Sequence, residues 1–345
     1  MIWLTWRQFR AQALATLLIL AAAAIYLLIT GFELRNSYHA DLSSCTAQGD
    51  CGAVLNQLQI SYNPALQFCE LLLVIVPGLI GIFWGAPLVG RELETGTYQL
   101  AWNQSVTRTR WLAVKLTGIG LAALVTTGAL SLLLTWWAGP LDQIEGNRFG
   151  DMTFSTRDIA PLGYALFAFA LGTTAGLLLR RAIPAMAVTL AVFIAVQILV
   201  PAAIRPNLLP STTTTVKIDE TTMGQANGIY GHGGNAGEFY ISGLNVPDGA
   251  WILSTTPVET ASGQDESMNA VSTCLPTPGA NAKLTSMPPF TQFGACVASD
   301  DLHESITYQP GSHYWPLQWF ETGFFLVLTA LLSGACFWII RRRRS

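Results

Sequence analysis

Charged residues are scarce in this 345-residue chain, where they make up 11% of the positions against 51% hydrophobic residues. A soluble domain carries about 25% charged residues, which keep its surface in contact with water. A chain with so few cannot cover a globular surface with polar groups, but lipid can cover that surface instead. The composition therefore excludes an ordinary soluble protein. A net charge of −3 also leaves no basic excess for nucleic acid.

The sequence signatures of common catalytic sites are missing as well. The chain has no G-x-x-x-x-G-K-[ST] phosphate loop, no HExxH zinc motif and no G-x-S-x-G nucleophile elbow. Its histidines fall outside the long hydrophobic segments, and no cysteine–histidine set has the spacing of a zinc site. We therefore expect no catalytic residue, no bound cofactor and no metal in this chain.

Acidic residues are nearly missing from the middle of the hydrophobic segments. Glu70 and Glu321 lie near expected outer helix ends. There we expect the carboxylates to reach water at the rim or to contact a loop, because burial within a membrane is costly. This pattern argues against a proton carrier with a carboxylate relay and against a channel lined by charged rings. It suits a lipid-like or amphipathic substrate, or a helix bundle that moves as a unit.

Six segments are apolar enough to cross about 30 Å of hydrocarbon, which takes about 20 helical residues. Each should be a helix, because a backbone in lipid must satisfy its hydrogen bonds within the segment. Gly81-xxx-Gly85 and Gly172-xxx-Gly176 are typical of close helix packing. The sequence thus predicts an all-α polytopic membrane protein with six transmembrane helices, approximately residues 11–31, 69–89, 112–137, 159–179, 183–204 and 318–340.

Basic residues predict the orientation of these helices. If both termini are cytoplasmic, the short inside segments hold most of the arginines, including the run Arg341 to Arg344. The outside segments then hold nearly all the acidic residues. This is the distribution that the positive-inside rule describes, so we expect a multi-pass protein with both termini in the cytoplasm.

The first ten residues are too short to span a membrane. Trp3, Trp6, Arg7 and Arg10 suit a short amphipathic helix that lies in the lipid headgroup layer. The alternative is a plain cytoplasmic flank with interfacial tryptophans.

A long outer segment, residues 205–317, precedes the last predicted helix. It is rich in Gly, Thr, Ser, Pro and Asn, and short alternating pieces near 237–244 and 250–254 suggest strands. We therefore expect five transmembrane helices in residues 1–204, a partly β extracytoplasmic domain in 205–317, and the sixth helix with a basic cytoplasmic tail in 318–345.

Four of the six cysteines lie in expected outer segments, which fits an oxidising compartment. Their spacing favours two local disulfides, Cys45–Cys51 and Cys274–Cys296. Free thiols, or cross-pairing between the two segments, are the alternatives.

The connection between the second and third helices, residues 90–112, is the most informative segment. It contains the only acidic cluster expected inside the cell, together with arginines and aromatic residues. A short amphipathic helix here can dock on a cytoplasmic partner through apolar anchors, with its acids paired to basic groups there and its arginines to acids or lipid phosphate. An ordinary loop with topogenic arginines is the alternative. The residues concerned are Arg91, Glu92, Glu94, Gly96, Thr97, Tyr98, Trp102, Arg108, Arg110, Trp111 and Lys115.

This connection resembles the cytoplasmic loop of type-2 ATP-binding-cassette (ABC) export permeases. In that family an R-E-x-E-x-G-T stretch follows the second span, as it does at residues 91–97, and a Thr-Arg pair and a lysine lead into the third span, as at 107–115. The stretches 4–10 and 308–323 also look similar, particularly to actinobacterial-looking members. Six spans with both ends inside match the family over the whole chain, whereas many members lack so long an outer segment.

The resemblance implies a permease subunit of an exporter in the bacterial plasma membrane, with residues 90–112 as its coupling helix. The cargo would be a hydrophobic or amphipathic drug, lipid or peptide. Expected partners are two copies of a cytoplasmic ATPase, which would hold ATP and Mg, a second permease chain, identical or related, and membrane lipid. The alternative is a sensor or mechanical transmitter whose outer domain binds a ligand and signals to a cytoplasmic ATPase without transport. An intramembrane enzyme is disfavoured, because no span holds a nucleophile–base or metal set.

Overall fold

The computed structural model describes residues 2–46, 51–96, 107–224, 226, 228–231, 237–244, 246–267, 269, 271, 274 and 290–342. The chain divides into two compact units. Residues 1–208 and 314–345 form the first unit, here called the bundle, and residues 209–313 form the second, here called the insert. Each unit has its own hydrophobic core.

Within the described residues, six helices are long and apolar enough to cross a membrane. The prediction of a mostly helical chain with six such helices and a small β region before the last is confirmed. Most of the helices extend beyond the apolar segments that predicted them, because a helix can continue past the hydrocarbon in polar turns. They are α1 (Ile2–Thr46), α2 (Gly52–Ile80) continuing through a π-helical turn into α3 (Ala86–Thr95), α5 (Arg108–Glu145), α7 (Ala160–Leu179), α8 (Ala182–Leu199) and α11 (Tyr314–Arg342).

The N-terminal residues are helical, but they do not form a helix of their own. The sequence predicts a separate short helix at residues 1–10, whereas α1 runs without a break from Ile2 to Thr46. No glycine or proline interrupts this stretch before Gly31, so the helix has no local reason to end near Arg10. The side chains of Trp3, Trp6, Arg7 and Arg10 lie outside the described ones, and their place in the headgroup layer stays a prediction.

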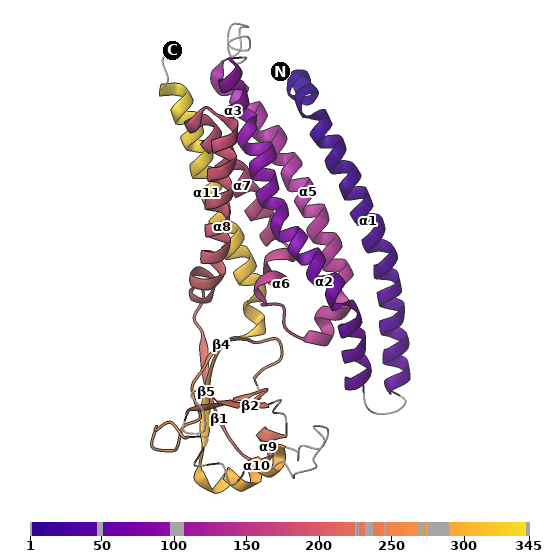
Figure 1. Cartoon of the computed structure of the whole chain (residues 1–345), viewed down its shortest axis with the longest axis vertical. Coiled ribbons are helices and arrows are strands. Elements are labelled where there is room, and N and C mark those ends of the chain that lie inside the picture. Colours follow the sequence, from indigo (N-terminus) through magenta and orange to yellow (C-terminus); the bar gives the residue numbers. More distant parts are fainter. Residues whose placement is uncertain are drawn as a thin grey trace. The chain divides into compact units, whose positions relative to one another are not determined.

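Helix α7 is the centre of the bundle and α1 lies at its edge (Figure 1). In the most apolar part of α7, 72% of the residues are buried within the protein, against 11% in that of α1. The two glycine motifs meet here, at the π-helical turn Gly81–Gly85. A Cβ on Gly81 would lie 2.7 Å from the carbonyl oxygen of Ala168, and Cβ atoms on Gly172 and Gly176 would overlap backbone oxygens of the α2–α3 helix. These glycines therefore allow two backbones to pack in direct contact.

The insert contains two small antiparallel sheets. The first has the order β1-β5-β4, from β1 (Thr212–Lys217), β5 (His303–Gln309) and β4 (Trp251–Thr255), and the second pairs β2 (Gly228–Gly231) with β3 (Phe239–Ser242). Alternate residues of β5 are buried, as expected of a strand with one face on a core. Helices α9 (Glu220–Met223) and α10 (Phe290–Val297) contribute Met223 and Phe293 to that core. The segments near 237–244 and 250–254 each contain a strand, as predicted.

Both local disulfides are present in the structure. Cys45 is bonded to Cys51 with their Cα atoms 4.9 Å apart, and this bond joins the end of α1 to the start of α2. Cys274 is bonded to Cys296 within the insert, with a Cα separation of 5.6 Å. The structure thus has the two local pairs and no bond between the two segments.

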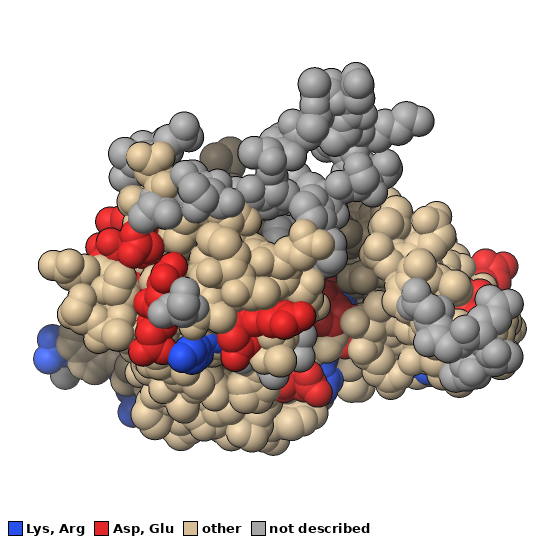
Figure 2. Space-filling model, turned by 90° about the horizontal axis from the view of Figure 1, so that it is seen from below, with Lys and Arg blue, Asp and Glu red and all other residues tan. Residues whose placement is uncertain are grey.

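Acidic side chains outnumber basic ones on the face drawn in Figure 2. Lys217 is the one lysine or arginine among the described residues of the insert, and it pairs with Asp301 at the surface. The insert thus has the acidic character that the sequence predicts for segments outside the cell.

Candidate coupling surface

The predicted coupling segment, residues 90–112, includes the end of α3 and the start of α5, and both helix ends are well defined. Helix α3 ends at Gly96, which adopts a left-handed conformation with φ of 73° that only glycine adopts without strain. Helix α5 begins after Thr107, whose Oγ1 accepts a hydrogen bond from the backbone N–H of Arg110 at 3.3 Å. Of the predicted coupling residues, Thr97, Tyr98 and Trp102 lie between these points, outside the described residues. The other predicted coupling residues lie on either side of residues 97–106, at the end of α3 and the start of α5.

Lys115 and Glu92 connect α3 to α5 just behind the segment. The Lys115 ammonium donates to Glu92 Oε1 at 2.5 Å and lies 3.4 Å from the carbonyl oxygen of Leu88. Their side chains are 4% and 14% exposed. The ammonium also lies 4.7 Å from the ring centroid of Trp111, within the range of a cation–π contact. This ion pair fixes the two ends of the segment relative to each other.

The sequence predicts that Glu92 pairs with a basic group on a partner, whereas in the structure Glu92 has an intrachain partner. The ammonium of Lys115 reaches it from the next helix, and a carboxylate this buried is costly without a cation. Lys115 and Trp111 are themselves 3% and 2% exposed. They hold the segment in place from behind and do not form a surface for a partner to touch.

Glu94 connects α3 to a third helix. One of its carboxylate oxygens accepts a hydrogen bond from the backbone N–H of Ala182, the first residue of α8, at 3.1 Å. A carboxylate is favoured there because the first N–H groups of a helix are unpaired and the helix dipole is positive at that end. The side chain of Glu94 is otherwise exposed. The end of α3 is thus joined to both α5 and α8.

A hydrophobic cluster lies directly beneath these polar contacts. It contains Val89 of α3, Trp111 and Leu112 of α5, Leu177 of α7, and Ile340 of α11, all buried. Four helices therefore pack together at this end of the bundle. Interdigitated side chains transmit displacement because protein interiors are close-packed.

Exposed arginines surround this cluster. Arg91 and Arg110 are exposed and Arg108 is half-buried, while Arg180 and Arg181 are exposed between α7 and α8. The start of α1 and the end of α11 lie at the same end of the bundle as the last turn of α3 (Figure 1). We call this end the basic end, and it presents cationic groups on rigid helix termini.

A buried arginine cluster lies at the opposite end of the bundle, near the short helix α6 (Asp151–Thr156). The guanidinium of Arg157 is 3.1 Å from Glu70 of α2 and 3.3 Å from Asp142 of α5, and Arg157 has no exposed surface. Thr153 of α6 also donates to Glu70, at 3.1 Å. This cluster connects α2, α5 and α6.

A second buried arginine cluster connects α6 to the other helices. Arg205, which follows the π-helical turn Val200–Ile204 after α8, pairs with Glu321 of α11 at 2.8 Å and donates to Ser155 of α6 at 2.9 Å. The hydroxyl of Tyr164 on α7 donates to the same carboxylate. Arg205 also stacks over the ring of Phe154, 4.2 Å from its centroid. Helices α6, α7 and α11 and the turn that holds Arg205 thus share one polar network, which is buried except for Asp151 of α6.

Glu70 and Glu321 do not reach water at the rim, because they are 4% and 1% exposed. The alternative expectation, contact with a connecting segment, is confirmed, since Arg157 follows α6 and Arg205 lies in a 3-10 turn. Arginines from distant parts of the chain compensate their charge, and α6 and its neighbours cover them. The sequence does not predict the buried ion pairs of Arg157 and Arg205, because both arginines lie in expected outer segments where exposed charges are ordinary. An arginine directly beside a long apolar segment is the one local signal that favours such a pair.

The described residues contain no group of three or more side chains that could hold a metal ion. The family described as ABC-2 membrane transporter related matches residues 17–205. This chain belongs to that family. The match covers nearly all of the first five candidate spans and all of residues 90–112, so the resemblance to the family is confirmed, while kinship to actinobacterial members stays a prediction. Comparisons with curated proteins and with solved structures give no match.

Membership points to a multi-pass membrane protein of an ABC transporter system. Permeases of this family are transport subunits and are not themselves catalytic. The matched residues include both helices that flank the coupling segment and the glycine crossing at the centre of the bundle. The insert lies outside the matched range.

Proposed function

We propose that this chain is the membrane-spanning permease subunit of an ABC exporter, which moves a hydrophobic or amphipathic compound out of the cell. A separate cytoplasmic ATPase, in two copies, binds ATP and Mg and supplies the energy. A second permease chain, identical or related, completes the complex in the bacterial plasma membrane. The carrying observation is that Glu92 and Glu94 join the coupling segment to α5 and α8 at once.

The argument for this function is mechanical. An ATPase in the cytoplasm can move a membrane protein only through contacts at the membrane surface. A force on residues 97–106 enters α3 and α5 through their capped ends, and the contacts of Glu92 and Glu94 pass it to α8 as well. Because α3 continues into α2 through the π-helical turn, the same force reaches the glycine crossing with α7. Packed helices of this kind switch between discrete arrangements.

Charge and redox chemistry support the orientation. The basic end of the bundle belongs in the cytoplasm under the positive-inside rule. The two disulfides belong in an oxidising compartment, and one of them lies in the insert. With both termini at the basic end, the insert is extracytoplasmic.

The test is to reconstitute the chain with a candidate phosphate-loop ATPase from the same genome and to measure ATP turnover and outward flux of hydrophobic dyes together. Arg91→Glu reverses an exposed charge at the coupling segment and should lower ATPase association and flux. Arg341→Glu, an equally exposed charge at the end of α11, is the matched control and should leave both unchanged. If the wild-type chain neither binds the ATPase nor shows flux-linked turnover, the proposal fails.

The second candidate is a sensor or mechanical transmitter. The insert favours it, because this unit has its own core and disulfide and so can bind a ligand independently of the bundle. Flux discriminates between the two functions. A transmitter alters ATP turnover when the insert is occupied, yet moves nothing across the bilayer.

A further inference from the structure

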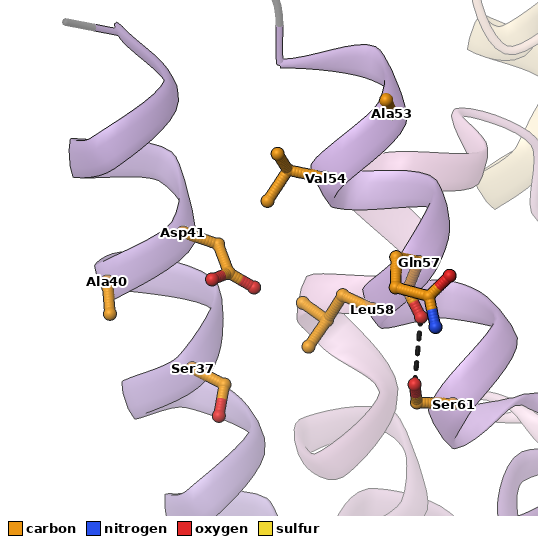
Figure 3. A pocket seen from close by; sticks show the side chains of 8 residues that line it. All are labelled: Ser37, Ala40, Asp41, Ala53, Val54, Gln57, Leu58 and Ser61. Carbon is orange, nitrogen blue, oxygen red and sulfur yellow. Dashed lines mark hydrogen bonds between the residues drawn. The ribbon is translucent and has the colours of Figure 1, made fainter.

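A groove opens between the end of α1 and the start of α2. Its volume is about 590 Å³, which is in the range of small-molecule sites. The disulfide between Cys45 and Cys51 joins the same two helices at this end and fixes their spacing. Eight residues line the groove (Figure 3): Ser37, Ala40, Asp41, Ala53, Val54, Gln57, Leu58 and Ser61.

Asp41 is the only charged residue in this lining. Its carboxylate points from α1 across the groove toward Leu58 on α2 (Figure 3), and its side chain is half-buried. Among the residues that the structure describes, no lysine or arginine forms an ion pair with it. Arg35, on the same helix, instead donates to the backbone oxygen of Trp136. A carboxylate without a counter-ion in this open groove favours a cation.

The rest of the lining has two kinds of surface. Val54 and Leu58 are apolar, and Leu58 is 7% exposed and belongs to the bundle core. Gln57 and Ser61 are polar, and Ser61 donates to the backbone oxygen of Gln57 at 2.9 Å, which leaves the amide of Gln57 to other partners. A ligand that fills this groove must combine an apolar body with a cationic or polar head.

The surroundings give such a ligand access from the bilayer. Phe32 of α1 and Ile60 and Phe68 of α2 are each more than half exposed, as expected of side chains in contact with lipid. An amphipathic cation concentrates at the bilayer interface, where its head stays hydrated and its body is buried. Its local concentration at the groove is therefore raised.

We propose that this groove binds an amphipathic organic cation, with the positive group beside Asp41 and the apolar body against Val54 and Leu58. The inference names a cargo class for the exporter, and in that sense it rests on the proposed function. Binding itself requires neither ATP nor the ATPase, so it is measured on this chain alone.

The probe is tetraphenylphosphonium, a rigid hydrophobic cation, and its comparator is tetraphenylborate, an anion of nearly the same size. Equilibrium dialysis of the full chain in dodecyl maltoside should show saturable binding of the cation and not of the anion. Asp41→Asn should weaken that binding about tenfold, since one charge–charge contact is lost in a partly buried site. Asp41→Glu should retain it. Glu33→Gln removes an exposed acid from the same helix and should leave it unchanged.

A second variant fills the groove and so tests whether the cation binds there. Ala53→Trp places an indole in the groove from an exposed position, so the fold is preserved and cation binding should be lost. The proposal is overturned if Asp41→Asn binds the cation as well as the wild type, if the anion competes with equal affinity, or if binding does not saturate. Cation binding without ATPase association would contradict the exporter proposal and support the cation site. Flux-linked ATP turnover without cation binding would support the exporter proposal and contradict the cation site.

Discussion

Removal of Lys115 should destabilise the bundle and uncouple it from its ATPase. In Lys115→Met, Glu92 stays beneath the coupling segment with 14% of its side chain exposed and no cation beside it. Breaking one side of a buried ion pair costs about 3–5 kcal/mol, and the partial exposure of Glu92 places the cost near the lower value. For a unit of this size, about 3 kcal/mol corresponds to a fall in unfolding temperature of roughly 6–12 °C.

The double variant Lys115→Met with Glu92→Gln leaves no unpaired charge, so it should recover most of that loss, to within about 1 kcal/mol of the wild type. Unfolding is followed by tryptophan fluorescence of the full chain in detergent. Lys217→Met is the matched control, because it breaks a surface ion pair whose side chains are 56% and 61% exposed and should leave the unfolding temperature nearly unchanged. If Lys115→Met alone is as stable as the double variant, Glu92 and Lys115 do not form the buried ion pair described here. Full flux in a folded single variant would refute its role in coupling.

Three further outcomes follow from the structure. Gly176→Ala places a Cβ against a backbone oxygen of the α2–α3 helix and should lower the unfolding temperature, whereas Gly118→Ala, which meets nothing within 4 Å, should not, by the same fluorescence assay. Burial raises the pKa of Glu304 to about 7 from its ordinary 4.5. The folded insert therefore keeps this proton to a higher pH than the unfolded chain does. The free energy of unfolding of the insert should fall by about 3 kcal/mol as the pH rises from 4.5 to 7. Proteolysis of the insert in the full chain should show that trend, and Glu304→Gln should abolish it. Arg157→Met leaves Glu70 and Asp142 buried without a cation, so it should destabilise the chain more than Asp142→Asn does in thermal unfolding.

The helices could be predicted from the sequence because their signal is local. The segment 159–179 is predicted and α7 spans 160–179, since Arg180 and Arg181 end the apolar run. The length of α1 could not be predicted, because its last turns are polar and hydropathy marks only the part in lipid. The strands near 237–244 and 250–254 were visible as short alternating segments between turn residues.

The ion pairs could not be predicted because their partners are far apart in the chain. Arg205 and Glu321 are separated by 116 residues, and no spacing rule connects them. From the sequence, Glu70 and Glu321 could be placed only by their position near the outer ends of apolar segments, which favoured a site at the membrane surface. Similarly, the acids of the coupling segment were identified as unusual for an inside loop, but their partners, Lys115 and the start of α8, follow from helix packing and not from local sequence.

The central claim is that energy enters this chain through the segment between α3 and α5. The most direct measurement is photo-crosslinking with benzoylphenylalanine at Arg91, beside that segment, and at Val125, an exposed position in the middle of α5. In the assembled complex, position 91 should crosslink to the ATPase, with a yield that changes on ATP binding, and position 125 should not. An ATPase that binds and turns over ATP in the complex without any crosslink from position 91 would contradict the account.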